Sequence, residues 1–544
     1  MERRSNSFLY LSAVCLSNPI HIDVDPECRI ISVEGKCACT VDRTTFAEHS
    51  HHPAVLMVRK CCEVATNSLG PRAVGASFGV PCALAQCPSN ALNALVNRHL
   101  TAPKNPIRIA LHNFFTRELA VVMKRTYFQK LSENLHAEWR VGKTQVKLAQ
   151  IDRSTIFDGL QQNKAKAFTK FEISTKVPTK ARIIQGNMNE RTAYEYPWEY
   201  QALAQTLKEI PPFEIDGVTF DLHYAGGLNH DELSDLLTEW CRGTNWYLDE
   251  RDGKNWDSTM QKATLLAEYD LYAFLGMKSA KRFFERCSGV KGYMRFKDAF
   301  IKYYTAWKRL SGDWNTSVGN TIISMMILVT AILMLPKSLR PKVVHGLFMG
   351  DDYLGAYHFD HKPDPTALCA ALNEYESLCG ITPERGIFED PYSVTFISLG
   401  VWPRLDGGLQ FVPQPAKQMR KLFWSVKRLD DVLLTDYEAQ IAEAFWPVYH
   451  GWEMMMAFLK LHYHPRRRKH QFELGYMHWM LTPRPRGVNW QMGFVWKYSI
   501  PYTACNFPIE RNPGECIIYH HPVVERMLEI ESQDPCERRW CLAH

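Results

Sequence analysis

Helical spacing of apolar residues recurs along much of the chain. Residues 105–135, 233–240 and 260–284 show it most clearly, and from residue 413 onward we expect helices rich in aromatic and basic residues. The longest uncharged apolar stretch, residues 321–336, is shorter than the roughly 20 residues that a membrane-spanning helix needs. It therefore predicts a buried core helix, and we expect no transmembrane segment.

Strand-like segments lie between these helices. Residues 165–187 are rich in β-branched residues and read as extended. Short apolar runs at residues 245–248 and 343–348 are each followed at once by acidic residues, which indicates buried strands that end in turns. Strands in the middle of the chain with helices around them predict an α+β core with helical lobes.

Composition places the chain among globular proteins. Of its 544 residues, 46% are hydrophobic and 22% are charged, and the net charge of +6 argues only weakly for a nucleic-acid partner. Eight of the 16 cysteines lie in the first hundred residues without the spacing of a secreted disulfide framework, so we expect reduced thiols. A structural zinc site is disfavoured, because its candidate ligands fit no standard spacing. These candidates are Cys37, Cys39, His49, His51, Cys61 and Cys62.

Two sets of carboxylates follow the two apolar runs. Asp351 and Asp352 come after Gly350, and adjacent carboxylates at a tight turn repel each other unless a divalent cation such as Mg²⁺ neutralises them. Asp252 and Asp257, five residues apart, follow the earlier run. An Asp at each of two neighbouring strand ends can share metal ions, and Asp257 would then face a sugar. The alternative for all of these residues is a solvated loop.

A polar segment precedes the apolar helix. Ser311 and Gly312 form a flexible turn, and Thr316 and Asn320 lie four residues apart on one helical face, where a hydroxyl and an amide can contact ribose hydroxyls. The alternative is an N-capped helix whose polar first turns face water.

Basic residues gather in two places. Lys176, Lys180 and Arg182 are spaced along an extended segment, which suits an incoming triphosphate. The run from Arg466 through Arg467 and Arg468 to Lys469 suits RNA phosphates, although a solvated surface explains it equally well.

The order of these segments resembles one family. A basic strand, D-x4-D, S-G-x3-T-x3-N and then G-D-D is the succession of motifs F, A, B and C in viral RNA-dependent RNA polymerases. Residues 311–320 and 181–185 are similar to those of plus-strand viruses of the tombusvirus and nodavirus kind. Residues 380–385 and 396–399 resemble motifs D and E, with Arg385 where the family usually has a lysine that acts as general acid. The resemblance covers residues 170–430.

The resemblance implies a right-hand polymerase with fingers, a palm built on an antiparallel sheet, and a thumb. Asp252 and Asp351, assisted by Asp352, would hold two Mg²⁺ ions, for which Mn²⁺ can substitute. The remaining site residues follow the same assignment. Lys176, Lys180, Arg182, Asp257, Ser311, Thr316 and Asn320 would bind the nucleotide, Arg385 would be the general acid, and Gly312, Arg466, Arg467, Arg468 and Lys469 would contact RNA.

The implied domains divide the chain in sequence order. They are a Cys-rich extension (1–100), fingers (101–244 and 261–300), palm (245–260 and 301–410), and thumb with tail (411–544). Template and product RNA and nucleoside triphosphates are the implied partners, with other viral replication proteins linking the enzyme to host membranes. The implied location is the host cytoplasm, in membrane-associated replication complexes.

Two other functions remain open on the sequence. A reverse transcriptase shares the palm carboxylates, but its motif C usually has another residue at the position of Gly350, and the pair of Asp257 and Asn320 favours ribonucleotides. A non-catalytic RNA-binding protein would explain the basic runs and leave the aspartates unexplained.

Overall fold

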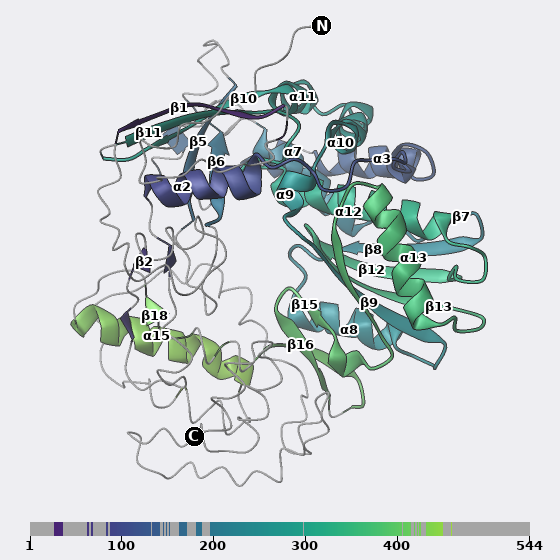
Figure 1. The fold of residues 1–544 in the computed structure, drawn as a ribbon. Coiled ribbons are helices and arrows are strands. Elements are labelled where there is room, and N and C mark those ends of the chain that lie inside the picture. The colour runs from purple at the N-terminus through teal and green to yellow at the C-terminus, as the bar shows by residue number, and fades with distance from the viewer. Residues whose placement is uncertain are drawn as a thin grey trace, which may run out of the picture.

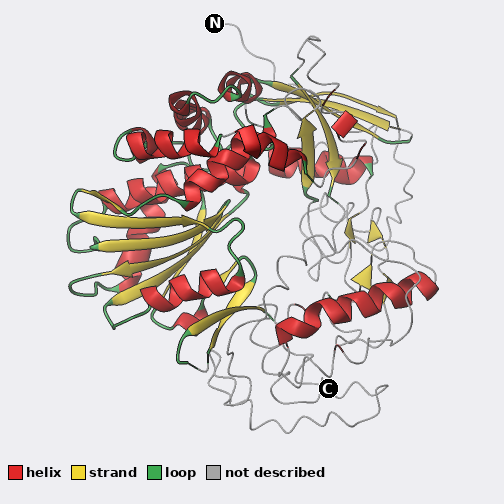
Figure 2. Cartoon of the chain, turned by 180° about the vertical axis from the view of Figure 1, so that it is seen from behind, coloured by secondary structure: helices red, strands yellow, loops and turns green. Residues whose placement is uncertain are grey.

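The structure is a computed structural model. It describes residues 25–35, 87–141, 163–170, 181–187, 196–414 and 431–449, with small gaps inside these ranges, and a few shorter pieces. Two large β-sheets dominate the described part, and a layer of helices lies above the larger one (Figures 1 and 2).

The five-stranded sheet joins segments far apart in sequence. Its order is β1 (Arg29–Gly35), β11 (Ala299–Thr305), β10 (Val290–Arg295), β5 (Lys164–Thr169) and β6 (Ile183–Asn187). Helix α2 (Pro88–Ala94) and the following turn η3 (Leu95–His99) pack apolar side chains against it. β1 pairs with β11, so this described part of the region predicted as a Cys-rich extension belongs to the five-stranded sheet. The pairing is invisible to local patterns, since the two strands are more than 260 residues apart.

The six-stranded sheet carries the acidic segments. Its order is β14 (Pro383–Phe388), β9 (Trp246–Gly253), β13 (Asp352–His358), β12 (Val343–Met349), β8 (Val218–Tyr224) and β7 (Phe213–Ile215). The strand predicted at residues 343–348 is confirmed. The strand predicted at 245–248 runs on through the acidic residues to Gly253. The sheet is mainly antiparallel, and only β12 and β8 among its neighbouring strands run parallel.

Two segments with helical spacing each contain more than one helix. Residues 105–135 contain η4 (Phe114–Thr116), α3 (Ala120–Lys130) and the start of α4 (Glu133–Arg140), while the residues before η4 are irregular. Residues 260–284 contain α10 (Lys262–Leu275) and the start of α11 (Ala280–Ser288). Gly276, with φ of 74°, ends α10 in the left-handed conformation that glycine adopts without strain.

The uncharged run forms the central helix α12 (Thr316–Met334), which packs against α13 (Pro365–Leu378), α10 and β12. Within the described residues, α12 is the one helix long and apolar enough to cross a membrane, and 83% of its most apolar window is buried in the protein. The prediction of a buried core helix is therefore confirmed.

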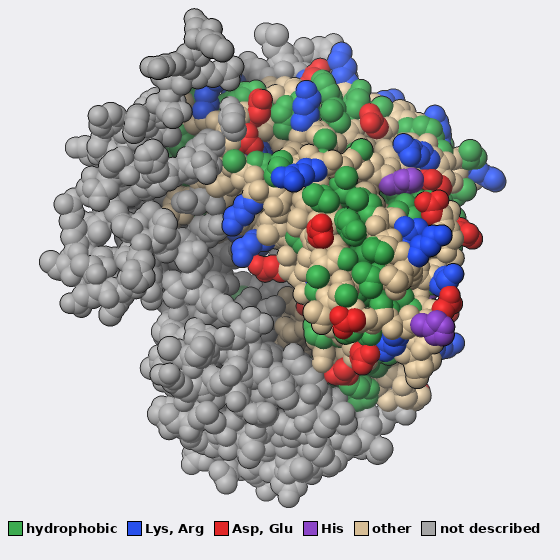
Figure 3. Space-filling view, turned by 45° about the vertical axis from the view of Figure 1, so that its right-hand side comes forward, with side chains coloured by type: hydrophobic (Ala, Val, Ile, Leu, Met, Phe, Trp, Pro, Cys, Tyr) green, Lys and Arg blue, Asp and Glu red, His purple; other side chains and the backbone are tan. Residues whose placement is uncertain are grey.

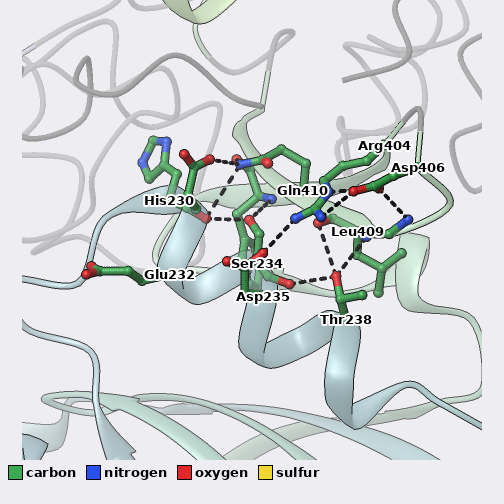
Figure 4. Close-up of polar contacts among 12 residues, drawn as sticks. His230, Glu232, Ser234, Asp235, Thr238, Arg404, Asp406, Leu409 and Gln410 are labelled. Atoms are coloured by element: carbon green, nitrogen blue, oxygen red, sulfur yellow. Dashed lines mark hydrogen bonds and ion pairs between the residues drawn. The ribbon is translucent and has the colours of Figure 1, made fainter. Parts of the chain in front are cut away.

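A small three-stranded sheet shares a hydrophobic cluster with helix α8 (His230–Trp240) and the six-stranded sheet. Its strands are β15 (Thr395–Phe396), β16 (Leu399–Pro403) and β17 (Leu409–Pro413), and β16 and β17 form a hairpin. The hydroxyls of Ser234 and Thr238, one helical turn apart, accept hydrogen bonds from the backbone N–H groups of Phe411 and Leu409, at 2.8 and 2.9 Å (Figure 4). The helix thereby satisfies amides at the edge of β17 that would otherwise be unpaired.

Beyond the hairpin, the helix α15 (Asp431–Tyr449) agrees with the helical expectation for the C-terminal part. The described cysteines are free thiols. On the face drawn in Figure 3, hydrophobic side chains form a band down the centre of the described residues, with Lys, Arg, Asp and Glu interspersed around it. Basic charge is therefore not concentrated on that face.

Candidate active site

Asp252, Asp351 and Asp352 lie at neighbouring strand ends of the six-stranded sheet. Gly350 and Asp351 form the two-residue loop between β12 and β13, and Gly350 has φ of 71°. The antiparallel register pairs Tyr353 with Arg251, so one position further along it places Asp352 beside Asp252. Asp252 is exposed, and the other two carboxylates are half-buried.

These carboxylates interact electrostatically. Burial raises the pKa of Asp351 to about 7, and the negative charges of Asp352, Asp257 and Asp252 add to the increase. A divalent cation would reverse this effect, and oxygen donors of this kind suit Mg²⁺. No set of three or more acidic, histidine or cysteine side chains within the described residues is gathered closely enough to form a complete metal site. Mg²⁺ commonly takes one or two carboxylates plus substrate phosphates, so the carboxylates present fit an ion that arrives with a nucleotide.

Asp257, Ser311 and Asn320 converge from three segments. A left-handed turn at Asn255 starts the short helix α9 (Trp256–Thr259), which carries Asp257. Its carboxylate accepts a hydrogen bond from the Ser311 hydroxyl at one oxygen and a 3.3 Å bond from the Asn320 side-chain amide at the other. The sequence predicted that these residues face the same ligand, and the structure brings them into direct contact.

Thr316 and Gly312 shape the turn before α12. The Thr316 hydroxyl lies 2.9 and 2.8 Å from the carbonyl oxygens of Leu310 and Asp313, so it holds the turn that precedes the helix. The alternative of a side-chain N-cap is wrong, because Asn315 at the N-cap position makes no capping hydrogen bond with its side chain. Gly312 has φ of 128°, and a Cβ there would lie 2.9 Å from the carbonyl oxygen of Gln185. A glycine is therefore required where the turn meets β6.

The comparison with known families covers this constellation. Residues 251–374 match the family described as viral RNA dependent RNA polymerase. The chain is an RNA-directed RNA polymerase. The match includes the three strand-end aspartates and the contact of Asp257 with Ser311 and Asn320, and it does not favour a reverse transcriptase or a non-catalytic RNA-binding protein. Comparison with the curated proteins finds no match.

The nucleotide-binding residues predicted on the basic strand are only partly described. Lys176 and Lys180 lie outside the described residues. Arg182 is exposed directly before β6, and its carbonyl accepts a 2.7 Å hydrogen bond from the backbone N–H of Lys170. The run Arg466 to Lys469 also lies outside the described residues, as do the six zinc candidates from Cys37 to Cys62.

The buried position of Arg385 is incompatible with its predicted role as general acid. Its guanidinium is completely buried and forms ion pairs of 2.7 Å with Asp249 and with Glu376. The charges of these carboxylates outweigh desolvation and hold the pKa of Arg385 well above its usual value. A proton held this tightly, inside the core, is not available to a leaving pyrophosphate.

The buried ion pairs of Arg385 belong to a network that sequence reasoning missed. Glu376 on α13 also accepts a 2.9 Å hydrogen bond from Arg251, whose guanidinium reaches Ser324 on α12. Burial raises the pKa of Asp249, which accepts a hydrogen bond from the Tyr357 hydroxyl. Arg251 immediately precedes Asp252, so the network anchors the strand that presents this aspartate.

Gln185 is a second residue that sequence reasoning assigned no role. Its backbone N–H donates a 2.6 Å hydrogen bond to the carbonyl of Ser311, and its side chain accepts a 2.6 Å bond from the Tyr303 hydroxyl. It therefore links β6 to β11 within the five-stranded sheet and to the turn before α12. A single Gln after an apolar pair gives no sequence signal for such a contact.

Proposed function

We propose that the polymerase copies a viral RNA genome by two-metal nucleotidyl transfer from ribonucleoside triphosphates. Asp252 and Asp351 would bind two Mg²⁺ ions, with Asp352 assisting. When bound, the ions would activate the RNA 3′-hydroxyl and neutralise the triphosphate. The observation that supports this best is the coupling of Asp351 to the other carboxylates, which leaves its ionised form in need of a cation.

The chain's own residues would select the sugar. Asp257, Ser311 and Asn320 form one hydrogen-bonded set, and a 2′-hydroxyl can join it as both donor and acceptor. Thr316 would contribute by holding the turn rather than by touching the nucleotide, since its hydroxyl is engaged by Leu310 and Asp313. Base identity would be read by the template.

The wider assignment follows the motif order. The five-stranded sheet would belong to the fingers, the six-stranded sheet would be the palm, and the hairpin on α8 would support the primer end. Lys176, Lys180 and Arg182 would steady the triphosphate. Gly312 and the run from Arg466 to Lys469 would contact RNA.

We also propose a lineage and a location. The sequence of residues 311–320 favours a polymerase of the tombusvirus and nodavirus kind. The virus would be one whose replication complexes form on membranes in the host cytoplasm. Contact with those membranes would be made by other viral proteins.

An incorporation assay tests the proposal. The purified chain is given a short single-stranded RNA, Mg²⁺ and labelled ribo- or deoxyribonucleotides, with and without a primer. Template-dependent incorporation of ribonucleotides is expected, and Asn320→Ala should narrow the preference over deoxynucleotides while synthesis continues. A wild-type preference for deoxynucleotides would overturn the assignment.

A further inference from the structure

We propose that Arg309 is a positioning residue for ribose selection, because it orients the Asn320 amide toward Asp257. The inference rests on the proposed sugar-reading role of Asp257 and Asn320. It assigns a function to a buried cation that touches neither the carboxylates of the metal site nor any surface.

Arg309 is attached to both partners that it would align. Its Nε donates a 2.8 Å hydrogen bond to Oδ1 of Asn320, and its backbone N–H donates a 3.2 Å bond to the carbonyl of Asp257. An Asn side chain has one acceptor oxygen and one donor nitrogen. With the oxygen held by Arg309, the nitrogen faces Asp257, where it makes the 3.3 Å contact. The flipped amide would place two donors against each other.

The guanidinium is itself held by a fully buried acid. Glu268 on α10 accepts from Arg309 at both carboxylate oxygens, and it also accepts from Asn315 at 2.9 Å and from the Tyr272 hydroxyl at 2.5 Å. Desolvation alone would lower the pKa of Arg309, but the charge of Glu268 outweighs it and raises that pKa. The guanidinium of Arg309 therefore stays protonated and remains bound to Glu268.

The helix that carries Asn320 approaches this pair unusually closely. A Cβ on Gly319 would lie 2.1 Å from Oε1 of Glu268, so only glycine lets α12 pack against α10 here. Helices α10 and α12 pack side by side (Figure 1). The glycine before Asn320, the buried acid and the arginine together fix one orientation of the amide.

The consequence concerns sugar discrimination rather than chemistry. Both oxygens of Asp257 are engaged, one by Asn320 and the other by Ser311, so a ribose hydroxyl meets a preset arrangement. Without the bond from Arg309 the amide can rotate, and the distinction between ribose and deoxyribose weakens. Asp252 and Asp351 do not depend on this bond.

The test measures the ratio of incorporation efficiency for a ribonucleotide over its deoxynucleotide in the full chain. Arg309→Lys keeps the charge beside Glu268 but removes the Nε donor, and it should lower the ratio about three- to tenfold. In an Asn320→Ala background, Arg309→Lys should change the ratio no further, because the amide it orients is gone. Glu268→Gln, which keeps the side-chain shape, should lower the ratio in the same direction.

A matched control separates positioning from stability. Arg340 binds the carbonyl oxygens of Leu333 and Leu335 at the far end of α12, so Arg340→Lys should lower the melting temperature and leave the ratio unchanged. An unchanged ratio in both Arg309→Lys and Glu268→Gln, alongside a lowered ratio in Asn320→Ala, overturns the inference alone. An unchanged ratio in Asn320→Ala overturns the sugar-reading role as well.

Discussion

The backbone N–H of Gly350 donates a 2.8 Å hydrogen bond to the hydroxyl of Thr321, one residue beyond Asn320 on α12. This bond ties the loop that carries Asp351 to the helix that carries the proposed sugar-reading amide. The two halves of the active site are thus fixed to each other through one buried hydroxyl, since Thr321 is fully buried.

Thr321→Val tests that link. Valine preserves the shape but leaves the Gly350 amide unpaired, at a cost of about 1–3 kcal/mol. We expect a lower free energy of unfolding in chemical denaturation and a lower turnover number. Thr321→Ser keeps the hydroxyl and should retain most of the activity. Equal turnover in wild type and the Val variant would mean that the bond does not position Asp351.

Gly350→Ala tests the backbone conformation of the same loop. The nearest atom to an added Cβ is 4.0 Å away, so the variant meets no clash, and its left-handed φ should cost about 1 kcal/mol. Gly217, with φ of 76° and open space around it, is the matched control in the turn between β7 and β8. Both alanine variants should lose similar stability in thermal unfolding, and Gly350→Ala alone should lose activity. Equal losses of activity in Gly350→Ala and Gly217→Ala would contradict a special role for the loop between β12 and β13.

The buried ion pairs next to Asp252 should contribute more to the free energy of unfolding than exposed ion pairs do. Arg385→Met removes the cation that Asp249 and Glu376 share in the core and leaves Asp249 without an ion-pair partner, and breaking such a pair costs about 3–5 kcal/mol. Glu389→Gln, which breaks the exposed pair with Lys362, should cost about 0.5 kcal/mol or less. Urea denaturation measures both. A cost for Arg385→Met as small as that of the control would show that the network adds nothing.

The raised pKa of Asp351 predicts how stability depends on pH. A carboxyl whose pKa rises from 3.8 to about 7 on folding stabilises the metal-free protein below pH 4, and that contribution is lost as the pH rises toward 7. Mg²⁺ favours the ionised form, so the increase in melting temperature on adding Mg²⁺ should grow between pH 6 and 8. In Asp351→Asn, the increase in melting temperature on adding Mg²⁺ should depend less on pH. A Mg²⁺ effect that is constant with pH in the wild type would contradict the coupling.

The sequence was sufficient for elements whose signal is local. The apolar run that became α12, the strand β12 and the acidic turn that follows β12 all depend on neighbouring residues. The contact of Asp257 with Ser311 and Asn320 is not local, and the order of the motifs predicted only that the three residues face the same ligand.

Side-chain direction within β9 was beyond the sequence analysis. Asp249, Glu250 and Asp252 are three acidic residues on one strand, and successive side chains of a strand point to opposite faces. Asp249 points into the buried network with Arg385, and Glu250 accepts hydrogen bonds from the backbone N–H and the hydroxyl of Thr395. Each partner lies more than a hundred residues away, so no local pattern could have separated the three acids.

The proposed mechanism depends on Asp252 and Asp351, which would serve template-directed RNA synthesis by binding divalent metal. The most direct measurement is the single-turnover rate of ribonucleotide addition on a short RNA template, for wild type, Asp252→Asn and Asp351→Asn. Asp364→Asn is the control, because Asn also caps a helix such as α13 well. We expect a wild-type rate in the control and no detectable product from either active-site variant, with folding and RNA binding preserved. Near-normal synthesis by Asp351→Asn would contradict it.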